Sequence, residues 1–420
     1  MRGRDRLPSL SQALFMRLVP RPPGTRDHSA KGHSDTFADT ISRMNTQDAR
    51  ISQALRRELE RFDPSLPIES AHTPPSSWYL DPAFERLERE TVFSHNWIAV
   101  GRTEQVSKPG DYLAGHILGM PYFVLRQEGG ALVAFHNACR HHATELLTGS
   151  GCLDHAGESP RITCPYHGWT YGSHGDLLSA PHMAGVKNFD RASMGLRTIA
   201  LETWQGYVFL NLDDDPSPRG PDLAELDTRL NQQFETSSLR HVMTRTYTVH
   251  CNWKVFVDNY LDGGYHVPVL HRGLAAGLDL DHYTTETFKR FSIQSCKAKE
   301  GRLGNQALYA WVHPNLMLNR YGGILDVNRV MPVAVDRTDV IFDYFFDESS
   351  SQNQSFISES IAQSEIVQQE DKQVCESVQR GLGSPAYDRG RYAPRIENGE
   401  HHFHSLLAHD YRNGTDSLTP

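Results

Sequence analysis

The sequence predicts an α+β chain in which a β-rich domain is followed by an α+β domain. Between about residues 95 and 212, apolar segments such as NWIAVGR, PYFVLRQEGGALVAFHN and TWQGYVFLNL are separated by turn residues, which is typical of strands. Gly129–Gly130, between two apolar runs, predicts a hairpin. Beyond the turn-rich segment DDDPSPRGP, strand-like segments are mixed with helical patterns near 253–265 and 355–382.

The N-terminal 53 residues are predicted to form a tail outside the fold. The stretch MRGRDRLPSLSQALFMRLVPRPPGTR is arginine-rich and interrupted by prolines, and it lacks the apolar run of a secretory signal. It is either a transit peptide or an over-extended start, because Met44 begins a cleaner sequence. A helical pattern over 48–62, a proline-rich linker and a short helix over 82–93 follow.

The domain boundary is expected in the linker after the β-rich segments. We predict that residues 54–215 form an N-terminal arm and the β-rich domain, and that residues 216–420 form the second domain. The chain has 51 acidic and 42 basic residues, so its charge favours no nucleic-acid partner. It has no run of about 18 apolar residues, so we expect no membrane span.

Two loops of the β-rich domain each supply one cysteine and one histidine, Cys139-x-His141 and Cys164-x-x-His167. Residues two apart in an extended loop point the same way, so Cys139 and His141 converge while His142 faces elsewhere. A Cys2His2 zinc site and a Rieske [2Fe–2S] centre are the competing interpretations. Zinc fingers usually pair Cys with Cys and His with His, whereas one Rieske iron takes two thiolates and the other takes two imidazoles. The mixed loops therefore favour the iron–sulfur centre.

A second group of metal-capable residues lies in DNYLDGGYHVPVLH. On a regular helix, His266 and His271 would lie roughly 140° apart, so they face one metal only if the helix is distorted. Gly263, Gly264 and Pro268 each weaken a regular helix, and distortions gather at functional sites. The alternative is two ordinary histidines near a helix end.

The third ligand of a 2-His-1-carboxylate iron site is predicted on the helix over 355–382. Asp371 falls on the apolar stripe that Val367 and Val374 mark, and Glu370 beside it is the second choice. A carboxylate on a buried face needs a cation or strong donors. The alternative is a structural Asp371 paired with an arginine or a capping amide.

The loop CPYHGWTY closely resembles the second cluster loop of Rieske oxygenases. Both constellations together resemble the large subunit of Rieske non-haem iron oxygenases over about residues 70–410. The resemblance implies a Rieske domain followed by a catalytic domain of the helix-grip type, with an antiparallel sheet and helices. It implies a [2Fe–2S] cluster held by Cys139, His141, Cys164 and His167, and a mononuclear Fe²⁺ held by His266, His271 and Asp371. Neither loop carries the extra cysteine of respiratory Rieske proteins.

Three positions depart from the usual pattern of the family. An acid normally stands three residues before the first histidine ligand and bridges the Rieske histidine of a neighbouring subunit to the iron site. Here that position is Gly263, and we predict Asp262 as the electron-transfer bridge, with Asp258 as the alternative. His142 and Ala143 stand where the family usually has arginine and glycine, so His142 is predicted to lie near the cluster without binding it.

The segments DNYLDGGYHVPVLHRGLAAGL and CESVQRGLGSPAYDRGRYAP resemble choline monooxygenases more than ring-hydroxylating dioxygenases. That resemblance implies hydroxylation of choline at its alcohol carbon, giving betaine aldehyde hydrate on the way to glycine betaine, with O2 and electrons from ferredoxin or a flavin reductase. Cation–π contacts contribute about 0.5–2 kcal/mol each, so we expect aromatic faces in the pocket. The candidates are Tyr309, Trp311 and Tyr321.

Alternative functions remain open. Within the enzyme class the alternative substrates are glycine betaine, a carnitine-like amine or an aromatic acid. In another class, the chain is a Rieske electron-transfer or metal-binding module without oxygenase activity. The family resemblance implies a homotrimer with electrons crossing between subunits. Six cysteines without a framework pattern fit a reducing compartment, so we expect a cytoplasmic location, or the chloroplast stroma if the tail is a transit peptide.

Overall fold

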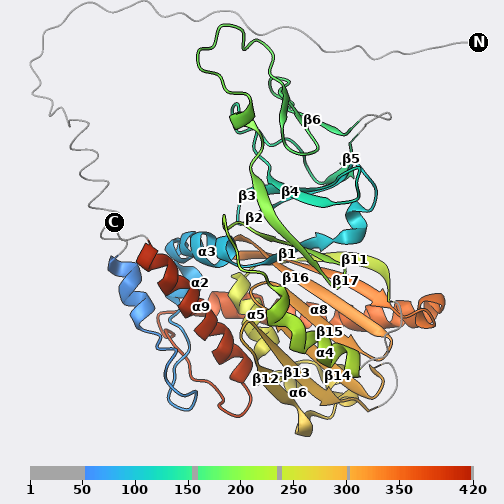
Figure 1. Ribbon diagram of the computed structural model, residues 1–420. Helices are drawn as coiled ribbons and strands as arrows, with labels where there is room; N and C mark the ends of the chain where they lie inside the picture. Colours follow the sequence, from blue (N-terminus) through green and yellow to red (C-terminus); the bar gives the residue numbers. More distant parts are fainter. Residues whose placement is uncertain (1–52, 154–158, 234–238, 300–302, 418–420) are drawn as a thin grey trace, which may run out of the picture. The chain divides into compact units, whose positions relative to one another are not determined.

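The computed structural model describes residues 53–153, 159–233, 239–299 and 303–417 (Figure 1). The first predicted helix falls partly outside these ranges, and its described part is helical over 53–60. The other helices are α2 (Ser77–Leu80), α3 (Pro82–His95), α4 (Ala224–Gln233), α5 (Trp253–Leu261), α6 (Val267–Leu270), α7 (Arg272–Gly277), α8 (Gln354–Leu382) and α9 (Asn398–Ser417). None of the helices in the described ranges is long and apolar enough to span a membrane.

The β-rich part contains two antiparallel sheets. The larger one has the strand order β1-β10-β9-β4-β3-β2-β5 and the smaller one the order β6-β7-β8. The predicted hairpin is confirmed: Gly130 has a positive φ of 81°, and the Gln127 N–H donates to the Ala131 carbonyl at 2.9 Å. The strands are β1 (Ile98–Arg102), β2 (Asp111–Ile117), β3 (Met120–Arg126), β4 (Leu132–His136), β5 (Ser150–Cys152), β6 (Arg161–Thr163), β7 (Thr170–Gly172), β8 (Leu177–Ser179), β9 (Thr198–Trp204) and β10 (Tyr207–Asn211).

The second half folds around one antiparallel sheet with the strand order β11-β17-β16-β15-β14-β13-β12. This confirms the predicted α+β class. The strands are β11 (Arg240–Val249), β12 (Thr284–Thr287), β13 (Phe291–Lys297), β14 (Gln306–Val312), β15 (Leu316–Tyr321), β16 (Ile324–Ala334) and β17 (Arg337–Phe346).

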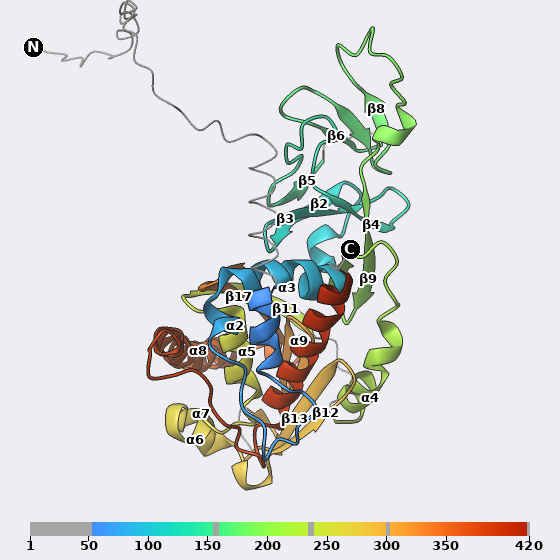
Figure 2. The ribbon, with the colours of Figure 1, turned by 90° about the vertical axis from the view of Figure 1, so that its left-hand side faces the viewer.

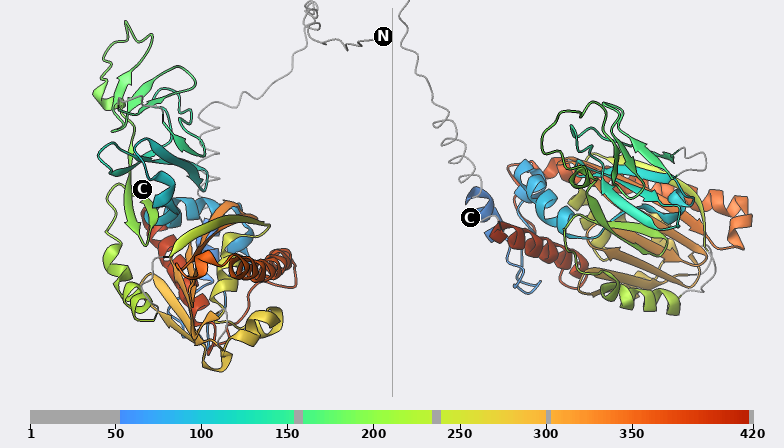
Figure 3. Two further views of the ribbon diagram at one scale, coloured as in Figure 1. Left: turned by 90° about the vertical axis from the view of Figure 1, so that its right-hand side faces the viewer. Right: turned by 45° about the horizontal axis from the view of Figure 1, so that its top comes forward.

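Alternating side chains place the two faces of this sheet in different cores. Leu308, Ala310 and Val312 of β14 pack in one core with residues of α4, β1 and β10. Ala307 and Trp311 point the other way, into the core that contains residues of α5, α8 and α9. Figures 2 and 3 show α4 and α8 on opposite sides of the sheet. The helices that carry the predicted iron ligands therefore cover one face only.

A buried ionic network joins the two halves. Asp343 of β17 accepts hydrogen bonds from Arg102 of β1 and from the Tyr207 hydroxyl of β10, the latter at 2.9 Å. Arg329 donates to the Val100 carbonyl at 2.7 Å. The Asp343 side chain is fully buried, so these donors are needed to stabilise its charge. The predicted domain boundary falls between β10 and α4 and stays a prediction.

The helices agree with the sequence prediction in part. The helix predicted over 253–265 ends at Leu261. Helices α4 and α9 were not predicted, because a weak apolar stripe among many polar residues gives little periodic signal. The helix over 82–93 is confirmed as α3, where the Asp81 carboxylate accepts the Ala83 N–H at 2.8 Å and Pro82 opens the first turn.

Candidate active site

Two loops of the β-rich part bring the first constellation together. The rings of His141 and His167 lie 4.7 Å apart between centroids. The thiols of Cys139 and Cys164 are buried in one apolar core. Burial and the hydrogen bond with the Cys139 thiol, at 3.3 Å, raise the pKa of Tyr171, and the Cys164 thiol adds to the effect. The two predicted histidines therefore lie side by side, and the two predicted cysteines share one core.

The chemistry of this donor set suits a metal cluster. Nδ1 of His141 is buried and has no hydrogen-bond partner among the described residues. Burial and the neighbouring rings of His142 and His167 lower the pKa of His141, which favours the neutral imidazole that binds metals. Trp169 stacks on the same ring at 4.8 Å with an interplanar angle of 6° and holds it in place.

His142 does not face away from the cluster loops, and that part of the sequence argument is wrong. Its ring centroid lies 4.0 Å from that of His141 and 5.4 Å from that of His167. The reason is that residues 140–142 form a turn, closed by the Ala143 N–H donating to the Cys139 carbonyl at 2.8 Å, and are not extended. His142 therefore lies against both predicted histidine ligands.

The second constellation forms a compact group under α8. Ligand atoms of His266, His271 and Asp371 all lie within 4.8 Å of one another. The chain reaches this geometry by ending α5 at Leu261 and resuming as α6, so the helix is broken rather than bulged. His266 immediately precedes α6 and His271 immediately follows it. The two rings meet with centroids 4.9 Å apart.

Two glycines allow this break. Gly263 and Gly264 both have positive φ values, 69° and 75°, in a region that L side chains rarely adopt. A Cβ atom at Gly263 would also collide with the Ile396 carbonyl. The Gly-Gly pair that weakens a helix in the sequence is thus needed to turn His266 back toward His271.

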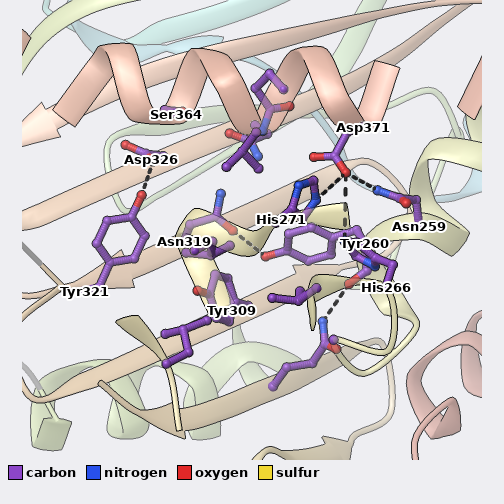
Figure 4. Close-up of a pocket in the computed structure, with 18 of the residues that line it drawn as sticks. Asn259, Tyr260, His266, His271, Tyr309, Asn319, Tyr321, Asp326, Ser364 and Asp371 are labelled. Atoms are coloured by element: carbon purple, nitrogen blue, oxygen red, sulfur yellow. Dashed lines mark hydrogen bonds and ion pairs between the residues drawn. The ribbon is translucent and has the colours of Figure 1, made fainter. Parts of the chain in front are cut away.

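Carboxylates orient both histidines. Nδ1 of His266 lies 2.6 Å from Oδ2 of Asp262, and Nδ1 of His271 lies 2.7 Å from Oε2 of Glu370. Each Nε2 atom then faces Oδ1 of Asp371, at 3.9 Å and 2.9 Å respectively (Figure 4). Such outer carboxylates fix the ring orientation of metal-binding histidines. The donor set fits a 2-His-1-carboxylate iron site.

The two alternative acids make different contacts. Asp371 points at both Nε2 atoms, whereas Glu370 bonds only the outer nitrogen of His271. Burial alone would lower the pKa of His271, but the hydrogen bonds and charges of Asp371 and Glu370 outweigh it and raise that pKa. Asn259 donates to Oδ1 of Asp371 at 2.8 Å.

Asp262 is tied to the loop that carries His266. It accepts the backbone N–H groups of Gly264 and Tyr265, at 2.9 and 3.2 Å, in addition to its contact with the His266 ring. Asp258 bonds instead to the Tyr79 hydroxyl at 2.8 Å and to His404 at 3.0 Å. Of the two acids, Asp262 is the one in contact with a predicted iron ligand, and its role as an electron bridge stays a prediction.

The three residues line one side of a cavity whose walls mix aromatic, aliphatic and polar side chains. Its lining includes Phe256, Tyr260, Tyr283, Tyr309, Tyr321 and Phe342. Tyr309 and Tyr321 thus lie where the sequence analysis expects substrate-facing aromatics. The rings of Tyr283 and Tyr309 are stacked at 6.4 Å. Burial raises the pKa of Tyr260 and Tyr283, so both stay neutral hydroxyls.

Trp311 does not line this cavity, so its prediction is wrong. It shares a face of β14 with Tyr309, but its ring is fully buried against Phe403 of α9, with centroids 5.2 Å apart. Its indole N–H donates to the Pro314 carbonyl at 3.3 Å. Packing against α9, a helix that the sequence analysis did not predict, therefore makes Trp311 part of the hydrophobic core.

Several polar residues of the cavity were missed in the sequence analysis, among them Asp326 and Gln294. Asp326 and Gln294 line the cavity and are 3% and 1% exposed, respectively. A signal was present, since each is a polar residue next to an apolar one in a strand-like segment, Leu325-Asp326-Val327 and Ile293-Gln294. A buried polar side chain in such a strand calls for a partner.

Comparisons with known proteins agree with this geometry. Residues 96–190 match the family model of the Rieske [2Fe-2S] domain, and residues 236–412 match that of the ring hydroxylating alpha subunit (catalytic domain). The choline monooxygenase, chloroplastic, of Arabidopsis thaliana is 44% identical over 84% of this chain and 86% of its own. The carnitine monooxygenase oxygenase subunit of Escherichia coli (strain K12) is 31% identical over 82% of this chain and 95% of its own.

A solved structure has the same fold. The crystal structure of the quaternary ammonium Rieske monooxygenase CntA with L-carnitine aligns with a TM-score of 0.70 at 29% identity, covering 82% of this chain and 96% of that one. The chain therefore belongs to the Rieske non-haem iron monooxygenases. Its cofactors are a Rieske [2Fe–2S] cluster and a mononuclear iron.

Proposed function

We propose that this enzyme is a choline monooxygenase. It hydroxylates choline at the alcohol carbon, using O2, two electrons and two protons, and releases betaine aldehyde hydrate and water. The relative with 44% identity carries that name, and the solved relative CntA is named for quaternary ammonium substrates.

The composition of the cavity wall carries this proposal. Among the described residues that line it there is no lysine or arginine, and its acids are Asp326 and Asp371. Glycine betaine, carnitine and an aromatic acid each bear a carboxylate, which needs a cationic partner when it is buried. Choline has the ammonium without the carboxylate. Its charge suits the faces of Tyr260, Tyr309 and Tyr321.

We assign the ligands as the geometry supports them. Cys139, His141, Cys164 and His167 hold the cluster, and His266, His271 and Asp371 hold the iron. When bound, these groups supply one-electron storage and O2 activation. The protein orients them: Asp262 and Glu370 keep the Nε2 atoms of the two iron-site histidines turned inward. The aromatic side chains of the cavity present apolar faces to the substrate.

We propose that electrons arrive from ferredoxin or a flavin reductase and cross between subunits of a homotrimer. Exposed apolar side chains at both metal sites support this. Tyr166, beside His167, is 65% exposed, and Tyr265, beside His266, and Val269, on α6, are 56% and 79% exposed. Aromatic side chains are enriched in the buried centres of protein interfaces, so these positions suit contact with another chain.

Subunit crossing is tested by mixing two inactive variants. Cys139→Ser lacks a cluster ligand and His266→Ala lacks an iron ligand. Activity should return when they are refolded together into mixed oligomers. No recovery, in mixtures shown by mass to contain both chains, would argue that electrons stay within one subunit.

The substrate is tested with the iron-replete protein, ferredoxin and a reductase. Choline should stimulate O2 uptake with an equal yield of betaine aldehyde, whereas L-carnitine, glycine betaine and benzoate should not. Preference for any of the carboxylates would overturn the proposal. Two irons per chain in place of three, with no substrate-dependent uptake, would indicate an electron-transfer module.

For the compartment we keep the prediction of a cytoplasmic location, with the chloroplast stroma as the alternative if residues 1–53 are a transit peptide. Import of a fluorescent protein fused behind residues 1–53 would support the alternative, and the relative from Arabidopsis thaliana is named chloroplastic.

A further inference from the structure

The cavity has a polar end away from the iron-binding residues. Asp326 lies on β16, opposite Asn319 of β15 and Tyr344 of β17. The Tyr321 hydroxyl donates to its Oδ2 atom at 2.5 Å. In Figure 4, Asp326 and Tyr321 lie at the side opposite His266 and Asp371, with Asn319, Tyr309 and Tyr260 between them.

We propose that Asp326 recognises the positive charge of the substrate and that its position decides which carbon is hydroxylated. The inference rests on the proposed function and adds the residue that orients choline. With the ammonium held beside Asp326, the N-methyl groups are kept away from the iron site and the alcohol carbon faces it.

Charge supports the role of Asp326. A quaternary ammonium has no N–H group, so it is recognised by a nearby anion and by aromatic faces rather than by hydrogen bonds. Asp326 is 3% exposed, and a carboxylate at this depth interacts with a cation far more strongly than one in water. Tyr309 and Tyr321 line the same cavity and supply the aromatic faces.

Gln294 of β13, which pairs with Tyr309 of β14, offers a contact for the hydroxyl group. Gln294 donates through Nε2 to the Tyr260 carbonyl at 2.8 Å, which fixes its amide. Its Oε1 atom is buried and has no hydrogen-bond partner among the described residues. Tyr260 is two residues before Asp262, which holds the His266 ring. A choline hydroxyl donating to Oε1 would therefore lie on the iron side, and an acceptor left buried without a donor is costly.

The two orientations give different products. Hydroxylation of the alcohol carbon converts a C–H bond into C–OH, consumes O2, two electrons and two protons, and yields betaine aldehyde hydrate and water. The same insertion at an N-methyl carbon yields an N-hydroxymethyl group. That group breaks its C–N bond to release formaldehyde and a proton, leaving a tertiary amine. The ratio of formaldehyde to betaine aldehyde thus reports the orientation.

The test uses choline, its uncharged isostere 3,3-dimethylbutan-1-ol, and the variants Asp326→Asn, Tyr321→Phe and Gln294→Met. Asp326→Asn should lower the preference for choline over the isostere, measured as the kcat/KM ratio, by about tenfold or more, because a buried charge pair is lost. It should also raise the share of formaldehyde. Tyr321→Phe should keep the preference and raise the formaldehyde share, because the charge remains while its position is loosened. Gln294→Met should mainly raise the formaldehyde share.

Asp339→Asn is the matched control, because it makes the same change on β17 at a residue that bonds Thr248 and does not line the cavity. It should leave both ratios unchanged. Unchanged ratios in Asp326→Asn and Tyr321→Phe, at full iron content, would overturn the inference while leaving the proposed function intact. A wild-type enzyme that does not oxidise choline would overturn the proposed function itself.

Discussion

The cluster loops and the iron site surround their histidines in opposite ways. At the iron site, His271 is 2% exposed and each ring nitrogen faces a carboxylate, Glu370 or Asp371. On the cluster loops, His142 and His167 are exposed, and within the described ranges no carboxylate bonds His141 or His167. An exposed cluster edge suits electron exchange with another protein. A buried, carboxylate-braced iron site suits chemistry from which water is excluded.

The largest expected effect is the difference between substitutions of His141, the proposed ligand, and of its neighbour His142. His141→Asn should abolish the red-brown colour and the EPR signal of the reduced cluster, because the proposed imidazole ligand of one iron is removed. His142→Asn should keep both, since we expect His142 to pack against the rings of His141 and His167 without binding the cluster. Visible absorbance and EPR of the two purified variants check this. A colourless His142→Asn variant would show that His142 shares the metal with His141 and His167.

Low pH should lower the stability of the catalytic half, because His313 is buried there. Burial lowers the pKa of His313 to about 4. Between that value and the ordinary value near 6.5, the unfolded chain binds a proton that the folded chain does not. The free energy of unfolding should therefore fall as pH drops from 6.5 to 4, by up to about 3 kcal/mol from this group.

Denaturant unfolding at several pH values checks the contribution of His313. His313→Asn should flatten the slope between pH 6.5 and 4, whatever its effect at neutral pH. An unchanged slope would mean that other groups set the acid sensitivity.

At the iron site, removing an outer carboxylate should weaken but not abolish function. Asp262→Asn should lower iron affinity or kcat about 10–100-fold, because the His266 ring loses the carboxylate that orients it. Asp258→Asn, whose carboxylate bonds Tyr79 and His404, should leave the iron content unchanged. Iron analysis and kcat of both variants test this difference between Asp262 and Asp258. Equal iron loss in the two variants would contradict it.

The smallest effect concerns the backbone of the first cluster loop. Ala143 has a φ of 57°, in the left-handed region that favours glycine. Ala143→Gly should therefore stabilise the loop by about 1 kcal/mol at most. Slower loss of cluster absorbance on heating would check it, with Ala131→Gly, outside that region, as the control. Faster loss in Ala143→Gly would indicate that the alanine methyl packs usefully there.

Both metal centres could be predicted from local sequence patterns. Features that depend on contacts between distant parts of the chain could not. Two kinds of signal depend only on neighbouring residues. They are the spacing of Cys and His within CRHHAT and CPYHGW, and the glycines just before His266. The turn at 140–142 could not be derived from the alternation of an extended strand. The prediction that Trp311 faces the substrate was wrong because of tertiary packing: α9, which lies far along the chain, covers its ring. Asp326 becomes informative only when strand pairing places it beside Tyr321 at the cavity.

A single-turnover experiment tests the central claim that this cavity accepts choline and presents its alcohol carbon to the iron site. The iron-replete protein is reduced chemically under anaerobic conditions, freed of excess reductant and mixed with O2 and one substrate, so that no electron donor has to be identified. Choline should give betaine aldehyde in an amount approaching one equivalent per intact site, with little formaldehyde. Oxidation of L-carnitine or glycine betaine, with choline left unchanged, would contradict the account.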